Sequence, residues 1–213
     1  MEKITVADLP ALFEEISHVM QQNKELLTSM DANMGDGDLG LTMTKGFGAL
    51  PAATRELQET DIGKFLVKTG WDLAAKIPST MGTLMASGLV ESGKVLFGKE
   101  ELGSSDFVLF FEAFGKGIEK RGKCKPGDRT VLDAIDGAAC AARNQISKDP
   151  STALPELLQE AYCGAEQGMK KTSEMLPKFG KAAVFQNKAL GIIDQGAMAG
   201  KLFVEGIRNF CVQ

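Results

Sequence analysis

Histidine and long hydrophobic runs are nearly absent from this sequence. Its 213 residues include one histidine, His18. A Ser-His-Asp or Cys-His nucleophile system would have to use that residue, which lies in an amphipathic segment, and a His-rich zinc site is excluded. No window approaches the ~18–20 uncharged apolar residues that span a bilayer, and the first residues lack the basic and apolar regions of a signal peptide. We therefore expect a cytoplasmic protein with no membrane contact.

Basic charge and paired cysteines are also scarce. The chain has 24 Lys and Arg against 28 Asp and Glu, a net charge of −4. Nucleic-acid backbones need a basic face, so nucleic acid is not expected as a partner, whereas small phosphorylated ligands are compatible with this charge. The cysteines, Cys124, Cys140, Cys163 and Cys211, form no C-x-x-C pair. Reduced thiols in a cytosolic protein are the expected state.

Alternating strand patterns are missing, and a hydrophobic period near 3.6 takes their place through most of the chain. The apolar positions predict helices over about 9–20, 39–55, 61–76, 81–97, 107–114, 132–146, 154–169 and 202–210. No linker rich in proline, serine or charge separates them, and no repeat is present. The sequence therefore predicts an all-α fold: a single domain over residues 1–213, built as a bundle of about eight antiparallel helices.

Glycine is abundant for a helical chain, with 24 residues. Some glycines fall inside predicted helices, where close helix packing accounts for them. Others stand in turns beside Asp, Ser, Thr and Lys. The strongest such turn reads Asp-Ala-Asn-Met-Gly-Asp-Gly-Asp-Leu-Gly over residues 31–40 and places the carboxylates of Asp31, Asp36 and Asp38 between two predicted helices.

Three converging carboxylates repel one another unless a cation lies between them. Glycine lets the backbone turn so that they can converge. Oxygen ligands of this kind suit Mg²⁺ or Ca²⁺ rather than zinc, and the spacing is not that of an EF-hand. A solvated turn is the alternative, because Asp and Gly are common turn residues. We favour a metal site at Asp31, Asp36 and Asp38.

Three further turns carry polar residues that could bind phosphate. Residues 78–83 place hydroxyls just before a helix, where free N–H groups favour an anion. Residues 121–130 hold four cations ahead of the next helix, and residues 180–182 and 191–197 place a lysine and an Asp-x-Gly turn before the last one. Taken singly, ordinary helix capping or a solvated loop explains each of them equally well.

The order of the four turns along the chain supports the interpretation that they form a single site. In an up-and-down bundle the connections alternate between two ends, and all four turns follow odd-numbered predicted helices. They should therefore lie at the same end. This arrangement predicts a metal and phosphate site built from turns on a helical scaffold.

At these residues the sequence resembles the L subunit of dihydroxyacetone kinases, which also forms the C-terminal domain of single-chain ATP-dependent versions. The resemblance covers essentially the whole chain, because the motifs occur in the same order with matching separations. The matching positions are Asp31, 35–38 and Gly40, then 121–123, 126–128 and Thr130, then Asp194 with 196–197.

The resemblance implies an eight-helix barrel that holds ADP or ATP at one end through two Mg²⁺ ions. Asp31, Asp36 and Asp38 would be the metal ligands, with no catalytic residue beyond them. The residues implied to line the nucleotide are Leu39, Gly40, Thr42, Thr80, Met81, Gly122, Val131, Lys181, Asp194, Gln195 and Gly196.

The resemblance also implies partners. In this family a separate K subunit or domain holds dihydroxyacetone, or a related small keto-sugar, covalently on a histidine, and the L part delivers the γ-phosphoryl group. Phosphotransferase-coupled systems recharge bound ADP with an M subunit. A chain of 213 residues has no room for the K domain, so a stand-alone L subunit that needs a partner is expected, and a homodimer is compatible. A non-catalytic regulatory module of the same fold is the alternative.

Five positions depart from the family pattern. Leu39 stands where histidine is usual, and Met81 where the Gly-rich turn usually has serine. Lys181 replaces an arginine, and lysine cannot fork onto two phosphate oxygens. Gln195 replaces a proline and Val131 a methionine. The metal ligands are retained while nucleotide-facing positions differ, which leaves open a divergent branch that acts on another keto-sugar.

Overall fold

Nine α-helices make up most of residues 2–212, the part of the chain that the computed structural model describes. They are α1 (Leu9–Gln22), α2 (Lys24–Met34), α3 (Leu39–Arg55), α4 (Ile62–Lys76), α5 (Thr80–Val95), α6 (Ser104–Gly122), α7 (Val131–Lys148), α8 (Leu154–Lys171) and α9 (Gln195–Val212). Short 3-10 helices are η1 (Val6–Asp8), η2 (Thr172–Glu174) and η3 (Lys181–Ala189). The two-residue strands β1 (Ile4–Thr5) and β2 (Glu101–Leu102) pair antiparallel.

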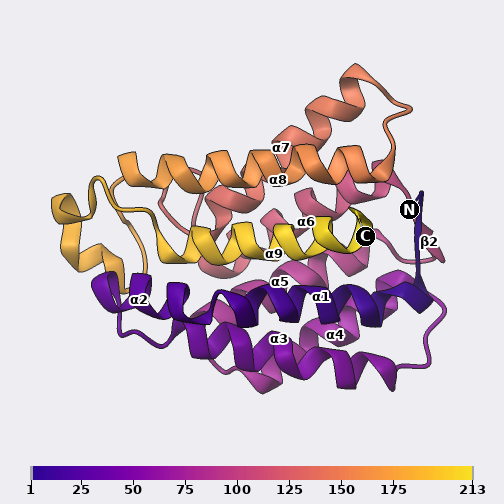
Figure 1. Cartoon of the computed structure of the whole chain (residues 1–213), viewed down its shortest axis with the longest axis horizontal. Helices are drawn as coiled ribbons and strands as arrows, with labels where there is room; N and C mark the ends of the chain where they lie inside the picture. Colours follow the sequence, from indigo (N-terminus) through magenta and orange to yellow (C-terminus); the bar gives the residue numbers. More distant parts are fainter. Residues whose placement is uncertain (1, 213) are drawn as a thin grey trace.

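The long helices close into a ring. Each of α3 to α8 packs against the next helix, and α1 packs against both α3 and α9. Most of the helices run along the long axis of the molecule, whereas α7 is inclined to it, and α2 extends the barrel at the end away from β2 (Figure 1). The all-α expectation is confirmed. The helix predicted over 9–20 corresponds to α1, whereas α2 was not predicted and is separated from α1 by a short break. The break falls at Asn23 (φ −102°, ψ 14°), whose side-chain amide donates to the Val19 carbonyl at 2.9 Å.

The predicted apolar stripes point into the barrel. Phe13, Phe47, Phe111, Phe114 and Phe203 are among the largest fully buried side chains. The rings of Phe114 on α6 and Phe203 on α9 lie 4.8 Å apart, centroid to centroid, across the interior. Aromatic pairs at this separation add to the free energy gained by burying their area. The core therefore fixes the positions of the helix ends on which the site is built.

Glycine allows two neighbouring helices to approach closely. A β-carbon added at Gly164 on α8 would lie 2.2 Å from the carbonyl oxygen of Gly137 on α7. One added at Gly117 on α6 would lie 2.4 Å from the Ser87 carbonyl oxygen on α5. These distances exclude any larger side chain without a shift of the backbone. The packing interpretation of the helical glycines is confirmed at these positions.

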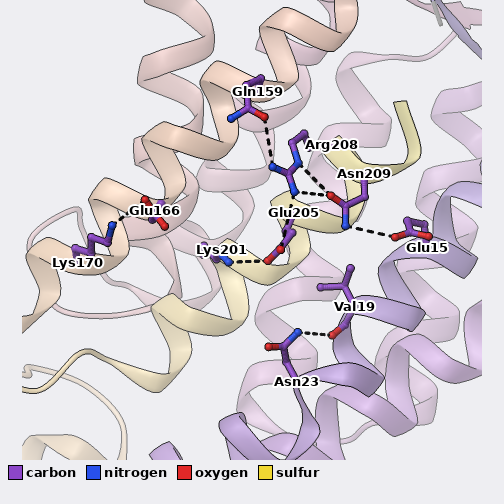
Figure 2. A network of polar contacts seen from close by, with 10 residues as sticks. All are labelled: Glu15, Val19, Asn23, Gln159, Glu166, Lys170, Lys201, Glu205, Arg208 and Asn209. Atoms are coloured by element: carbon purple, nitrogen blue, oxygen red, sulfur yellow. Dashed lines mark hydrogen bonds and ion pairs between the residues drawn. The ribbon is translucent and has the colours of Figure 1, made fainter. Parts of the chain in front are cut away.

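Polar side chains join α1, α8 and α9 on one flank of the barrel (Figure 2). Arg208 on α9 donates to Gln159 on α8 at 3.3 Å, and its neighbour Asn209 donates to Glu15 on α1 at 3.4 Å. The guanidinium carbon of Arg208 lies 4.2 Å from the ring centroid of Tyr162. Together with the apolar core, these contacts hold α9 against both neighbours.

Within residues 2–212, no helix is both long enough and apolar enough to cross a membrane.

Candidate functional site

Four helix N-termini meet around a cavity of about 350 Å³. The first residues of α3, α5, α7 and α9 all line it: Leu39, Thr80, Val131 and Gln195. Each helix start offers N–H groups without helical partners and the positive end of a helix dipole. The prediction that the four turns lie at the same end is thereby confirmed. A cavity bordered by several helix N-termini is suited to an anionic ligand.

The acidic turn brings its three carboxylates together at this cavity. Oxygens of Asp31, Asp36 and Asp38 all lie within 4.8 Å of one another. Asp31 is buried on α2, and its Oδ2 accepts hydrogen bonds from the backbone N–H groups of Asp38 at 3.0 Å and Leu39 at 3.2 Å. The turn reverses at Gly37, where φ is +77°. Its backbone thus fixes Asp31 as the rigid member of the cluster.

Two side chains from distant turns reach the acidic cluster. Lys181 at the start of η3 forms an ion pair with Asp36. Gln195 donates its Nε2 to Oδ1 of Asp31 at 3.3 Å, and its Oε1 is buried without a hydrogen-bond partner among the described residues. Because proline has no such donor, the glutamine adds a contact to Asp31 that the usual residue would lack. At Leu39 only the backbone contacts the cluster: its N–H donates to Asp31, whereas its side chain is buried in the core.

A divalent cation fits the chemistry of this donor set. The acidic residues lining the cavity are four aspartates, Asp31, Asp36, Asp38 and Asp194, and the basic ones are Lys181 and Arg129. The clustered donors are carboxylate oxygens, which Mg²⁺ prefers. An anion alone would be repelled by this surplus of carboxylates, whereas cations held by the carboxylates would bridge to it. Asp31, Asp36 and Asp38 are the residues that would hold such ions.

The turns before α5 and α7 are built by side-chain caps. The hydroxyl of Ser79 accepts from the N–H of Gly82 at 3.0 Å, which is the ordinary capping role. Thr80 follows it and is exposed at the cavity. Before α7, the hydroxyl of Thr130 accepts from Leu132 N–H at 3.2 Å, and Asp133 accepts from the N–H of Thr130 at 2.6 Å. These caps hold the two turns at the cavity's edge.

Asp194 is buried before α9. Its Oδ1 accepts from the N–H of Ala197 at 2.8 Å, and its own N–H donates to the Thr172 hydroxyl at 2.9 Å. Burial raises the pKa of Asp194 to about 6, although the Ala197 N–H and the Arg129 guanidinium both favour the ionised form. Next to it, a β-carbon at Gly196 would lie 3.1 Å from Met81 Cε. Gly196 at the start of α9 therefore leaves room for the side chain of Met81 at the start of α5.

The structure brings together all of the predicted site residues but one. Asp31, Asp36, Asp38, Leu39, Thr42, Thr80, Met81, Gly122, Val131, Lys181, Asp194, Gln195 and Gly196 all line the cavity. Gly40 is outside that lining. A β-carbon there would lie 2.2 Å from the carbonyl oxygen of Lys24, so this glycine serves the close contact between α3 and α2.

The structure adds cavity residues that the predicted set lacked. They are Ser79, Leu84, Cys124, Arg129, Thr130, Phe179, Gly180 and Ala182. Most flank predicted residues in the same turns, and that adjacency could have identified them. Of the four cations in 121–130, only Arg129 lines the cavity; the other three are exposed. His18 lies on the exposed side of α1, outside the lining.

Comparisons with known proteins identify the family of this chain. The family model described as "DAK2 domain" matches residues 33–209. The protein named "PEP-dependent dihydroxyacetone kinase, ADP-binding subunit DhaL" from Escherichia coli (strain K12) is 26% identical over 179 residues, which cover 84% of each chain. The L-erythrulose kinase of Pectobacterium atrosepticum is 28% identical over 89% of this chain and 32% of its own length.

A solved structure shares the fold. It is titled as the dihydroxyacetone kinase from C. freundii in complex with AMP-PNP and Mg²⁺. The TM-score is 0.69 at 22% sequence identity, and the match covers 95% of this chain and 34% of that chain. At this identity the likeness bears on the fold alone.

Proposed function

The chain belongs to the DAK2-domain family, and from that premise we propose that it is a phosphotransferase subunit. It would hold ADP or ATP with Mg²⁺ in the cavity at the end of the barrel. It would pass the γ-phosphoryl group to dihydroxyacetone, or a related small keto-sugar, held on a separate K subunit. The named relatives support this proposal, since the E. coli protein is called an ADP-binding subunit and others are called kinases.

The observation that carries the proposal is the convergence of the carboxylate cluster with four helix N-termini. Phosphoryl transfer needs positioning and neutralisation of charge more than it needs a nucleophilic side chain. The helix starts at Leu39, Thr80, Val131 and Gln195 offer N–H groups to phosphate oxygens. When bound, two Mg²⁺ ions would neutralise charge on the phosphates. A cavity without a histidine in its lining can therefore still serve this reaction.

Residues of this chain divide the remaining tasks. Asp31, Asp36 and Asp38 would hold the ions, with Asp31 fixed by the backbone of the turn. Lys181 would turn from Asp36 to a phosphate oxygen as a single charge rather than a fork. Apolar residues of the lining, including Leu84 and Val131, would contact the base.

The acceptor would be bound by residues outside these 213. The E. coli relative matches over 84% of its own length, whereas the L-erythrulose kinase matches over only 32% of its length. The chain thus corresponds to about a third of the L-erythrulose kinase. We propose that this third is the part that holds the nucleotide. A partner chain would then supply the keto-sugar, and an M-type subunit would recharge bound ADP if phosphoenolpyruvate is the donor.

The test is phosphoryl transfer with purified components. The chain, Mg²⁺ and ATP are mixed with a dihydroxyacetone-loaded K subunit, and dihydroxyacetone phosphate is measured. We expect product only when all are present, and none with Asp36→Asn. Glu160→Gln, on the exposed surface of α8 and outside the cavity lining, is the matched control and should keep full activity.

Two negative outcomes have different meanings. Nucleotide binding without transfer to any keto-sugar would contradict the phosphotransferase and favour the regulatory module. Failure to bind nucleotide with Mg²⁺ at all would contradict both.

A further inference from the structure

Arg129 is a buried arginine in a strained backbone conformation. Its exposed fraction is 1%, and its φ is +62°, in the left-handed region that non-glycine residues rarely adopt. Glycine or asparagine would fit that backbone at less cost. The contacts of its side chain must therefore offset the cost of placing an arginine at this position.

The guanidinium of Arg129 reaches the segment that connects α8 to α9. Its Nε donates to the Thr172 carbonyl at 3.2 Å, and its Nη2 donates to the carbonyls of Ala189 at 3.4 Å and Ile192 at 2.9 Å. Thr172 stands where the segment begins, whereas Ala189 and Ile192 stand where it ends. Arg129 thus holds the two ends of the segment together from the turn before α7.

The segment between those ends carries cavity residues. Residues 179–182 line the cavity, and Lys181 among them pairs with Asp36. The segment lies beside the end of α2 (Figure 1), where Ala182 and Ala189 form a small apolar cluster with Met34. Beside this small cluster, the segment is held by Lys178, whose N–H and ammonium both contact Asp128, and by the three carbonyl contacts of Arg129.

Arg129 lines the cavity with most of its hydrogen-bonding groups already in use. Its Nη1 is buried and without a hydrogen-bond partner among the described residues, and its other nitrogens are used by the segment. Of the charged groups near it, Asp194 is close enough to feel its positive charge. Among the described residues, the side-chain hydrogen bonds of Arg129 all go to carbonyls of the segment.

We propose that Arg129 is a positioning residue: it holds the Thr172–Ile192 connection over the cavity and so sets the place of Lys181. The proposal rests on the proposed function, since it assigns Lys181 to the nucleotide. Lysine could satisfy only part of this role, because a single ammonium cannot span three carbonyls with the fixed fork of a guanidinium.

The first measurement is amide hydrogen exchange of the ligand-free protein. Arg129→Met should speed exchange over residues 173–192 and leave the middle of α3 and α5 unchanged. Arg143→Met, on α7 and outside the cavity lining, is the matched control and should leave residues 173–192 unchanged. Unchanged exchange over 173–192 in Arg129→Met would overturn the proposal. If Arg129→Met fails to fold, Arg129→Lys is measured instead and must show the same change in smaller degree.

The second measurement is a double-mutant cycle on the dissociation constant for ADP with Mg²⁺, by calorimetry. Arg129→Met should weaken binding by about tenfold, and Arg129→Lys should restore part of the loss. Lys181→Ala should weaken binding in the wild-type background but add little in Arg129→Met, because the lysine has already lost its place. Strictly additive losses would overturn the proposal. If the wild-type protein binds no ADP, the proposed function fails while the exchange measurement still decides the role of Arg129.

Discussion

Lys181 of η3 forms an ion pair with Asp36 of the acidic turn, and the pair links the segment before α9 to the turn before α3. The side chains are 59% and 45% exposed, so water screens the interaction. Exposed ion pairs contribute about 0–1 kcal/mol to the stability of a fold. The contact matters for the acidic cluster rather than for the fold, because it places a positive charge beside carboxylates that would otherwise repel one another.

Replacing Lys181 should therefore affect binding far more than folding. We expect Lys181→Ala to weaken binding of ADP with Mg²⁺ by about tenfold, as a charge-assisted phosphate contact is lost. The denaturation midpoint should stay close to that of the wild-type protein. Calorimetry and urea unfolding check the two halves of this prediction. Lys188→Ala, an exposed lysine of the same segment and outside the lining, is the control; an equal loss there would mean that only net charge matters.

Gly35 offers a test of the metal geometry that leaves the charge unaltered. A β-carbon at this position would lie 2.2 Å from Oδ1 of Asp31. Gly35→Ala should thus displace the carboxylate and weaken Mg²⁺ binding at least about tenfold, measured by titration of Mg²⁺ in the presence of ADP. At Gly103 no atom lies within 4 Å of an added β-carbon, so Gly103→Ala should bind as the wild type does. Equal affinities of the two variants would refute this geometry.

The buried carboxyl of Asp194 should make stability depend on pH. Its pKa is about 6 in the folded chain and about 3.9 in an unfolded one. The folded state therefore holds this proton more tightly. The contribution of Asp194 to stability is complete below about pH 4, declines as pH rises to about 6, and is constant above that. Ionisation of the folded-state carboxyl at neutral pH costs about 3 kcal/mol.

Asp194→Asn removes this titration and keeps an oxygen to accept from the Ala197 N–H. Urea unfolding of both proteins at pH 4 to 8 is the measurement. The stability of the variant relative to wild type should increase between about pH 4 and 6 and stay level at higher pH. A difference that is independent of pH would show that Asp194 is ionised throughout that range.

The sequence predicts the helices and their arrangement because both depend on local patterns. The apolar stripe of Phe107, Phe110, Phe111 and Phe114 lies at helical spacing, and all four side chains are buried in the structure. The order of the turns then predicted that the acidic cluster lies at the same end of the bundle as Lys181 and Asp194. Helix α2 escaped prediction, since only Leu27 and Met34 among its buried residues are apolar and they form no stripe.

The sequence alone could not predict contacts between residues that lie far apart in the chain. Arg129 could be read only as one of four cations in a loop, because its acceptors Thr172, Ala189 and Ile192 lie 43 to 63 positions away. Gln195 was a departure from a family pattern until the fold placed it 3.3 Å from Asp31. Gly40 matched the pattern as a site residue, whereas its tight contact with Lys24 assigns it to helix packing.

The most direct test of the account is the thermal unfolding midpoint with ADP, Mg²⁺ and both together. Ligands that bind only the folded state raise stability by about 2.7 kcal/mol at 100 times their dissociation constant. We predict a clear rise in the midpoint with both ligands, a much smaller one with either alone, and no joint effect in Asp36→Asn. A midpoint that ADP with Mg²⁺ leaves unchanged in the wild-type protein, or raises equally in Asp36→Asn, would contradict the account.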